Sequence, residues 1–210
     1  MARRLAVDYE TISPYSFLKS LPEIARNTVP YELREYCKLT GFEAWNLLEE
    51  GVFYFFRHIF MLHTIKLGSD TLFKHEPEGI VLWDRCGGQN AFLYECKSRV
   101  DGYVISSDDL LRYRDYIKLK KHHIKFKHHL PLTHFLIVSS EFKGDIELRL
   151  KEIDLEGVIL SLISADCLKL LYEEAKALEF DGLHLLDLSR LFCRGQLCEA
   201  DVSKAIANTV

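Results

Sequence analysis

The chain contains little glycine or proline, no long apolar run and no excess of positive charge. Only 11 glycines and 5 prolines occur in its 210 residues, which excludes a collagen-like or mucin-like protein. No stretch reaches the roughly 18 uncharged apolar residues of a membrane-spanning helix. Residues 1–7 lack the apolar run of a signal peptide. We therefore expect no membrane segment and a cytoplasmic location.

Paired cysteines are also absent. The six cysteines show neither a CxxC pair nor the spacing of zinc ligands: Cys37, Cys86, Cys96, Cys167, Cys193 and Cys198. In a chain without a secretion signal, free thiols in a reducing compartment are expected.

The charge balance is mildly acidic, with 27 Lys and Arg against 31 Asp and Glu and a net charge of −4. This balance argues against a protein coated with positive charge for non-specific binding to nucleic acid. A hydrophobic content of 48% excludes a disordered chain. The length fits one domain whose core needs no disulfide or metal to fold.

Hydrophobic periodicity predicts helices first and then alternating strands and helices. Residues 14–66 follow a helical pattern, which includes one long helix over 43–66. Strands are predicted over 79–83, 91–96, 133–140 and 157–163, and helices over 106–121, 143–153, 165–180 and 186–192. We therefore expect an α/β fold in which a mixed β-sheet is flanked by helices. Residues 1–66 would form an N-terminal helical segment packed on a core of residues 67–210, within one domain.

Acidic residues lie at the ends of the first two predicted strands. Pro77 and Glu78 precede one strand, and Glu95-Cys96-Lys97 ends the next. Because side chains alternate along a strand, Glu95 and Lys97 share a face while Cys96 points into the core. A hairpin brings the two carboxylates together, and such oxygens suit Mg²⁺. The simpler interpretation is a turn followed by surface charges at a strand end.

Several further segments occur in the same order as in a known nuclease family. They are 23–27 (EIARN), 66–68 (KLG), 77–79 (PEG), 95–97 (ECK), 102–103 (GY), 135–144 (FLIVSSEFKG) and 157–161 (GVILS). Over roughly residues 17–206 the chain resembles the cleavage domain of FokI-like type IIS restriction endonucleases, which belong to the PD-(D/E)xK nuclease superfamily.

The resemblance implies a restriction-endonuclease-like core and Mg²⁺-dependent hydrolysis of phosphodiester bonds in double-stranded DNA. It makes Glu78 and Glu95 metal ligands, with the backbone carbonyl of Cys96 as a third, and Lys97 the catalytic lysine. It also places Glu49 on a helix close to the metal. The family has Asp where this chain has Glu78, whose side chain is one methylene longer.

Asp108 and Arg112 are spaced i, i+4 on the predicted helix over 106–121. On the residues alone they form an exposed pair within that helix. By the resemblance, they instead pair across a dimer of nuclease domains. A dimer fits the chemistry, since one site cuts one strand and a double-strand break needs two sites.

The resemblance leaves no room in this chain for a separate DNA-recognition module, and no helix-turn-helix or zinc-finger pattern occurs. We therefore expect the small cleavage subunit of a heterodimeric type IIS enzyme in a prokaryotic cytoplasm, with a larger subunit that recognises DNA. The alternatives are a free-standing homodimeric endonuclease, a fragment of a longer enzyme, and a non-catalytic DNA-binding or assembly module of the same fold.

A basic segment, residues 118–129 (KLKKHHIKFKHH), is a candidate surface for binding DNA phosphates. Its lysines are Lys118, Lys120, Lys121, Lys125 and Lys127, and Tyr103 is a further candidate for DNA binding. The simpler interpretation is a solvated helix end and loop. The adjacent histidines of the segment do not share one helix face, which argues against a metal site.

Replacing these five lysines with glutamine is expected to weaken the salt dependence of DNA binding. The slope of log Kd against log salt concentration should fall by about 0.9 for each phosphate that the protein no longer neutralises. Fluorescence-anisotropy titrations at several salt concentrations measure this slope. An unchanged slope would contradict a role of the segment in DNA binding.

Overall fold

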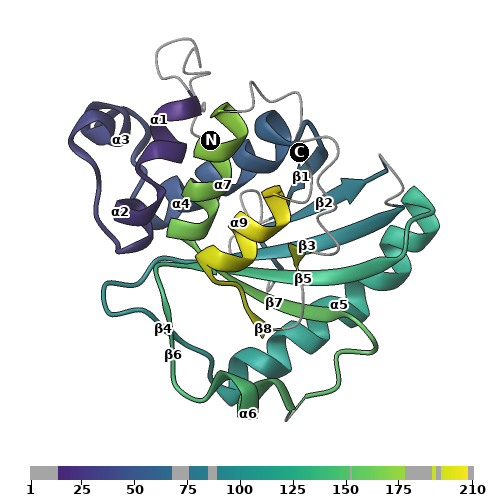
Figure 1. The fold of residues 1–210 in the computed structure, drawn as a ribbon. Helices are drawn as coiled ribbons and strands as arrows, with labels where there is room; N and C mark the ends of the chain where they lie inside the picture. The colour runs from purple at the N-terminus through teal and green to yellow at the C-terminus, as the bar shows by residue number, and fades with distance from the viewer. Residues whose placement is uncertain are drawn as a thin grey trace.

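The computed structural model describes residues 14–67, 76–84, 89–151, 153–177, 191–192 and 195–207. In this part of the chain, helices cover both faces of a mixed β-sheet (Figure 1). The helices are α1 (Pro14–Lys19), α2 (Leu21–Ala25), α3 (Arg34–Thr40), α4 (Ala44–Tyr54), α5 (Ser107–His128), α6 (Ile146–Lys151), α7 (Ala165–Ala177) and α9 (Glu199–Ala207). A 3-10 turn (Tyr31–Leu33) precedes α3, and a π-helical turn (Phe55–Ile59) follows α4. The predicted α/β architecture is confirmed.

The main sheet has the strand order β1-β2-β3-β5-β7-β8. Its strands are β1 (His63–Lys66), β2 (Gly79–Trp83), β3 (Asn90–Lys97), β5 (Leu132–Ser139), β7 (Ile159–Ser164) and β8 (Gly195–Gln196). β1, β2 and β3 are antiparallel neighbours, whereas β3, β5, β7 and β8 run parallel. A separate parallel pair joins β4 (Tyr103–Val104) and β6 (Phe142–Lys143).

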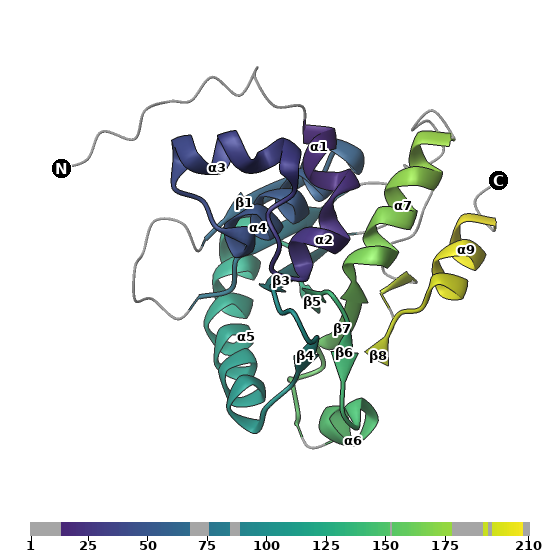
Figure 2. The ribbon, with the colours of Figure 1, turned by 90° about the vertical axis from the view of Figure 1, so that its left-hand side faces the viewer.

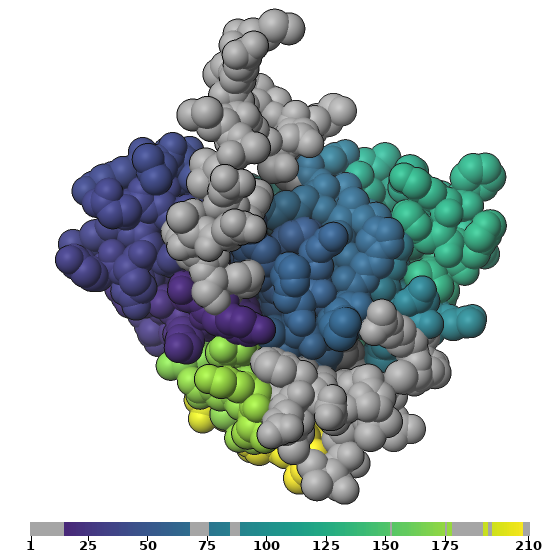
Figure 3. All heavy atoms as spheres, turned by 90° about the horizontal axis from the view of Figure 1, so that it is seen from above, coloured from purple at the N-terminus to yellow at the C-terminus, as the bar shows by residue number. Residues whose placement is uncertain are grey.

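Side chains of alternating positions pack on opposite faces of the sheet, as the pleat requires. One face, which includes Phe92, Tyr94 and Val138, packs against α1, α2, α4, α7 and α9. The other face, which includes Leu93 and Ile137, packs against α5 and α6. Figure 2 shows α5 on the side of the sheet opposite α2 and α7, and Figure 3 shows the outer surface of the layer that contains the N-terminal helices and α7.

The predicted helix over 43–66 is wrong at its C-terminal end. α4 stops at Tyr54, the π-helical turn continues to Ile59, and the chain then enters strand β1. Met61 takes a positive φ of 52° between them. The physical reason is that His63–Lys66 pairs along β2 at the sheet edge. Its β-branched residues Thr64 and Ile65 suit a strand.

The other predicted elements agree with the structure apart from their ends. β2 coincides with the predicted strand 79–83, and the helix predicted over 106–121 continues to His128. β4, β6, β8 and α9 had no counterpart in the sequence prediction. The turn predicted after 83 and the helix predicted over 186–192 lie mostly outside the described residues. The proposed division at residues 66 and 67 stays a prediction.

Two further properties concern helices and thiols. None of the described helices combines the length and the apolar character needed to cross a membrane. Four cysteines in the described part of the chain are free thiols: Cys37, Cys96, Cys167 and Cys198.

Gly79 allows β2 to pack closely at its first residue. It lies opposite Tyr94, whose side chain is fully buried, and a Cβ at position 79 would overlap the Tyr94 ring. Gly79→Ala is therefore expected to lower the free energy of unfolding by about 1–3 kcal/mol. Urea denaturation measures this decrease.

The same substitution made in a Tyr94→Leu background is the control, because it removes the ring that a Cβ would meet. We expect the cost of Gly79→Ala to be smaller there. An equal cost in both backgrounds would show that the Tyr94 ring is not the reason for glycine at this position.

Candidate active site

Glu78 and Glu95 face each other where the β2–β3 hairpin opens. The last antiparallel pair is Gly79 with Tyr94, so Glu78, one residue before Gly79, lies opposite Glu95, one residue after Tyr94. The backbone N–H of Leu67 donates to the carbonyl oxygen of Glu78 at 2.9 Å. That bond extends the β1 pairing by one residue and fixes the backbone of Glu78. The sequence prediction that these two acids come together agrees with this geometry.

Glu95 is buried, Glu78 is partly buried, and the two carboxyl groups interact. Burial raises the pKa of Glu78 well above its usual value, and the charge of Glu95 and a hydrogen bond between the two side chains raise it further. The Oε2 atoms of Glu78 and Glu95 are both buried without a hydrogen-bond partner. Buried carboxylate oxygens in this state favour either a proton or a cation.

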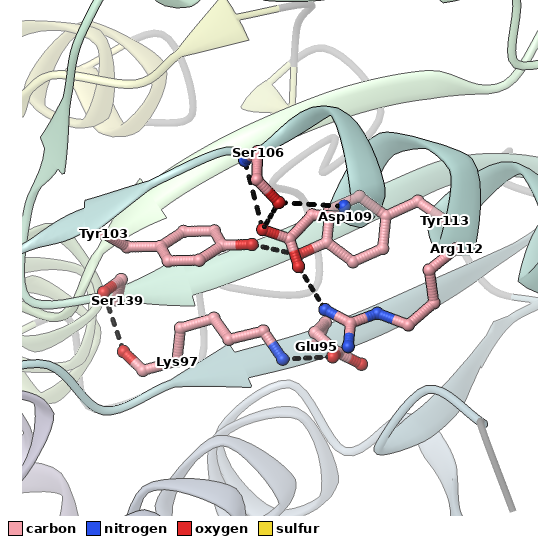
Figure 4. A network of polar contacts seen from close by, with 8 residues as sticks. All are labelled: Glu95, Lys97, Tyr103, Ser106, Asp109, Arg112, Tyr113 and Ser139. Atoms are coloured by element: carbon pink, nitrogen blue, oxygen red, sulfur yellow. Dashed lines mark hydrogen bonds and ion pairs between the residues drawn. The ribbon is translucent and has the colours of Figure 1, made fainter.

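Lys97 is the cation nearest to Glu95 along the strand. Its Nζ pairs with Oε1 of Glu95, and the two side chains are only 16% and 4% exposed. Both project from the same face of β3 (Figure 4), while Cys96 packs into the opposite core. The hydroxyl of Ser139 on β5 donates to the carbonyl oxygen of Lys97 at 2.7 Å, which anchors the end of the strand.

Glu49 reaches the same site from α4. Burial raises its pKa to about 7, with Lys66 lowering it and the charges of Glu50 and Glu95 raising it. Glu50 pairs with Lys66 at the end of β1. The electrostatic coupling of Glu49 to Glu95 places this helix acid close to the carboxylate pair.

Helix α5 forms the other wall. Arg112 lies beside Glu95 in Figure 4 and pairs with Asp109. Asp109 also accepts hydrogen bonds from the backbone N–H and the hydroxyl of Ser106 at 3.1 and 2.7 Å. Burial raises the pKa of Tyr116, one helical turn beyond Arg112, and the charge of Glu95 adds to that increase.

Within this chain, Arg112 does not form the predicted pair with Asp108. Arg112 pairs with Asp109 instead, because Asp109 is held in place as the third residue of a capping box with Ser106. Asp108 is exposed on the outer side of α5. The capping pattern Ser-x-x-Asp is present in the sequence and was the signal that could have identified Asp109.

Tyr103 does not lie where DNA could reach it. Its side chain is 5% exposed, and its hydroxyl is hydrogen-bonded to that of Tyr113 at 2.6 Å. It also hydrogen-bonds to Asp109. The prediction that Tyr103 contacts DNA is therefore corrected: it packs beneath α5 and supports the network drawn in Figure 4.

The predicted DNA-binding lysines fall into two groups. Lys118, Lys125 and Lys127 are exposed on α5. Lys120 instead forms an ion pair with Glu76 at 3.0 Å, and Lys121 donates to the carbonyl oxygen of Glu156 at 2.8 Å. The three exposed lysines are therefore better placed than the other two to meet phosphates.

The donor set at the hairpin end fits a hard divalent cation. Within the described ranges, no three side chains of His, Cys, Asp or Glu are grouped to hold a metal ion. The candidate ligands are the carboxylates of Glu78 and Glu95, and the resemblance adds the backbone carbonyl of Cys96. Mg²⁺ uses few protein oxygens and keeps several waters, so the two unpaired buried oxygens are consistent with it.

Comparisons with known proteins agree with this architecture. The family model of the FokI cleavage domain matches residues 3–193. The structure of restriction endonuclease FokI aligns with a TM-score of 0.67 and 20% identity over 89% of this chain and 32% of that one. The structure of FokI bound to DNA gives 0.62 and 20% over 89% and 31%. This chain thus spans about a third of those chains. No match was found among curated proteins.

The raised pKa of Glu49 predicts how stability depends on pH in the metal-free protein. Folded Glu49 keeps its proton to about pH 7, whereas the ordinary pKa is 4.5. Between these values the folded state binds more protons, so the free energy of unfolding falls as pH rises from 4.5 to 7. Glu49→Gln is expected to remove roughly 2 kcal/mol of this decline.

Urea denaturation in EDTA at pH values between about 5 and 8 tests this expectation. Glu35→Gln, on the exposed surface of α3, is the matched control and should keep the wild-type pH dependence. Identical profiles for Glu49→Gln and wild type would contradict the assigned environment of Glu49.

Proposed function

The chain belongs to the FokI cleavage-domain family, and from this premise we propose that it is a Mg²⁺-dependent endonuclease that hydrolyses one strand of double-stranded DNA. The observation that carries the proposal is the pair of Glu78 and Glu95, each with a buried, unpartnered oxygen, beside the ammonium of Lys97. These are the three positions of the nuclease motif in the sequence.

The chemistry divides between the metal and the residues of this chain. Glu78, Glu95 and the carbonyl of Cys96 would hold Mg²⁺, which lowers the pKa of a bound water and offsets phosphate charge. Lys97 orients the attacking water and balances the negative charge that grows on the phosphate. The attacking water loses a proton to solvent as its oxygen forms a bond to phosphorus, the bond to the leaving sugar oxygen breaks, and that oxygen takes up a proton from solvent.

Glu78 is compatible with this role although it is one methylene longer than the family's Asp. It lies one residue outside the β2–β3 ladder, where its longer side chain still reaches Glu95 closely enough for a hydrogen bond. Glu is an oxygen ligand of the same chemical type. We therefore assign both acids as ligands and Glu49 as a carboxyl group close to the metal.

We further propose that the chain works as the cleavage subunit of a type IIS restriction enzyme, with a larger subunit that recognises DNA in the prokaryotic cytoplasm. One site cuts one strand, so a partner supplies the second cut. The outer side of α5 supports such an association: Asp108 is exposed, and Leu111 and Leu119 are 47% and 60% exposed. Arg112 is turned inward to Asp109, so in this arrangement Asp108 is the residue available to a partner.

Two alternatives make different demands. A homodimeric endonuclease would use the same face of α5 and need no second protein. A non-catalytic DNA-binding or assembly module would not need Lys97 beside Glu95. The ammonium of Lys97 beside two carboxyl groups with unpartnered buried oxygens favours an enzyme, because this combination suits a metal-assisted hydrolysis.

Lys97→Ala tests the enzymatic proposal. It is expected to reduce Mg²⁺-dependent nicking of supercoiled plasmid about 100-fold or more, with DNA affinity retained. The assay compares the chain alone with the chain plus a candidate DNA-recognising subunit, in Mg²⁺ and in EDTA. Lys169→Gln, which removes an exposed lysine of an ion pair on α7, is the control and should cut at the wild-type rate.

Full activity of Lys97→Ala, or equal cutting in EDTA, would contradict the proposed mechanism. Cleavage at a defined sequence by the chain alone would contradict the subunit role and favour the homodimer.

A further inference from the structure

Lys120, one of the lysines predicted to contact DNA, forms an ion pair beside the candidate metal site that is well shielded from solvent. Lys120 on α5 lies 3.0 Å from Glu76, and the two side chains are 11% and 20% exposed. The Lys169–Glu173 pair on α7, by contrast, is 38% and 55% exposed. Glu76 is two residues before Glu78, so this pair ties α5 to the segment that carries the first acid.

Lys120 belongs to a stripe of α5 that faces the acids. Arg112, Tyr116 and Lys120 are spaced i, i+4 and i+8 and therefore share one side of the helix. The charge of Glu95 acts on both Arg112 and Tyr116, and the charge of Glu78 acts on Tyr116. One turn further, Lys120 reaches Glu76. Successive residues of this stripe therefore face Glu95, Glu78 and Glu76 in turn.

The position of Glu78 depends on interactions on both sides of it. After Glu78, the Gly79–Tyr94 pair begins the ladder. At Glu78 itself, its carbonyl oxygen accepts from the N–H of Leu67. Before Glu78, buried Pro77 restricts the backbone, and the Glu76 side chain is anchored by Lys120. The short segment from Glu76 to Gly79, which contains Glu78, is therefore held at both ends, by the Glu76–Lys120 ion pair and by the ladder that begins at Gly79.

Removing Lys120 would disturb more than the ion pair itself. Glu76 would keep a largely buried negative charge without its partner, which is strongly unfavourable. It would also add uncompensated charge two residues from Glu78. The link before Glu78 would move toward solvent, and the carboxylate of Glu78 would no longer be fixed opposite Glu95.

We propose that Lys120 and Glu76 are a positioning pair that holds Glu78 in the geometry needed to bind Mg²⁺, and that Lys120 does not contact DNA. This inference rests on the proposed function, because it assigns Glu78 as a metal ligand. It separates Lys120 from Lys118, Lys125 and Lys127, which remain the candidates for binding phosphates.

Calorimetric titration of the full chain with MgCl₂ tests the pair without relying on cleavage. Lys120→Gln and Glu76→Gln are each expected to raise the Kd for Mg²⁺ about tenfold, the lower end of the effect seen for residues that orient metal ligands. Lys120→Arg should stay near wild type. The exchanged double variant Lys120→Glu with Glu76→Lys should recover most of the affinity, because it restores the ion pair.

The control for the metal titration is Lys169→Gln, which should leave the Kd unchanged. Thermal unfolding of each variant shows whether it is folded. If Lys120→Gln does not fold, the exchanged pair decides: recovered Mg²⁺ affinity supports the proposal, and a folded exchanged variant with a Kd about tenfold above wild type overturns it. An unchanged Kd in folded Lys120→Gln also overturns it.

DNA binding distinguishes positioning from direct binding of phosphate. In a Lys97→Ala background, Lys120→Gln should leave the salt slope of DNA binding unchanged, whereas Lys118→Gln should lower it by about 0.9. A lowered slope for Lys120→Gln would overturn the proposal. If wild type does not bind Mg²⁺, or if Glu95→Gln binds Mg²⁺ as well as wild type does, the proposed function fails as a whole. That outcome differs from an unchanged Kd in Lys120→Gln alone.

Discussion

The repulsion between two adjacent carboxyl groups, each with one buried oxygen, is the constraint on which the rest of the site depends. Glu78 and Glu95 face each other with a buried, unpartnered oxygen on each, and burial raises the pKa of Glu78 well above its usual value. Such an arrangement is unfavourable unless a proton or cation lies between the groups. The surrounding fold therefore has to hold it in place. The Leu67 N–H bond on the β1 side, the ring of Tyr94 under Gly79 and the anchoring of Glu76 by Lys120 all act on the few residues around Glu78.

Helix α5 faces the acids on its inner side and is exposed to solvent on its outer side. Its inner stripe faces the acids, with Arg112 beside Glu95 and Lys120 bound to Glu76. Its outer side exposes Asp108, Leu111 and Leu119. Because both stripes belong to one continuous helix of 22 residues, an interaction that fixes the outer side also fixes the support of the acids. The capping box at Ser106 sets where this helix begins, and so it sets which acid Arg112 meets.

Local patterns were sufficient to predict the hairpin and its acids but not the pairing of distant segments. The apolar runs over 79–83 and 91–96 and the alternation along a strand place Glu95 with Lys97 and opposite Glu78. β1 was missed because its helical periodicity continues past Tyr54, and its partner strand β2 lies further along the chain. Lys120 and Glu76 are separated by 44 positions, and no local spacing indicates their pairing. The burial of Tyr103 likewise comes from α5 packing over it, which composition cannot show.

Under the proposed function, the charges at the site favour binding of the metal before DNA. Burial raises the pKa of Glu49 and Glu78, so in the metal-free protein these acids favour their protonated forms, and Lys97 is already paired with Glu95. The metal-free site therefore offers an approaching phosphate little electrostatic attraction. A divalent cation between the acids would displace their protons, supply positive charge and satisfy their unpartnered oxygens. Under the proposed function, the metal would therefore form part of the surface that DNA meets. A net charge of −4 is compatible with a nuclease whose positive field would be supplied locally by an ion and a partner.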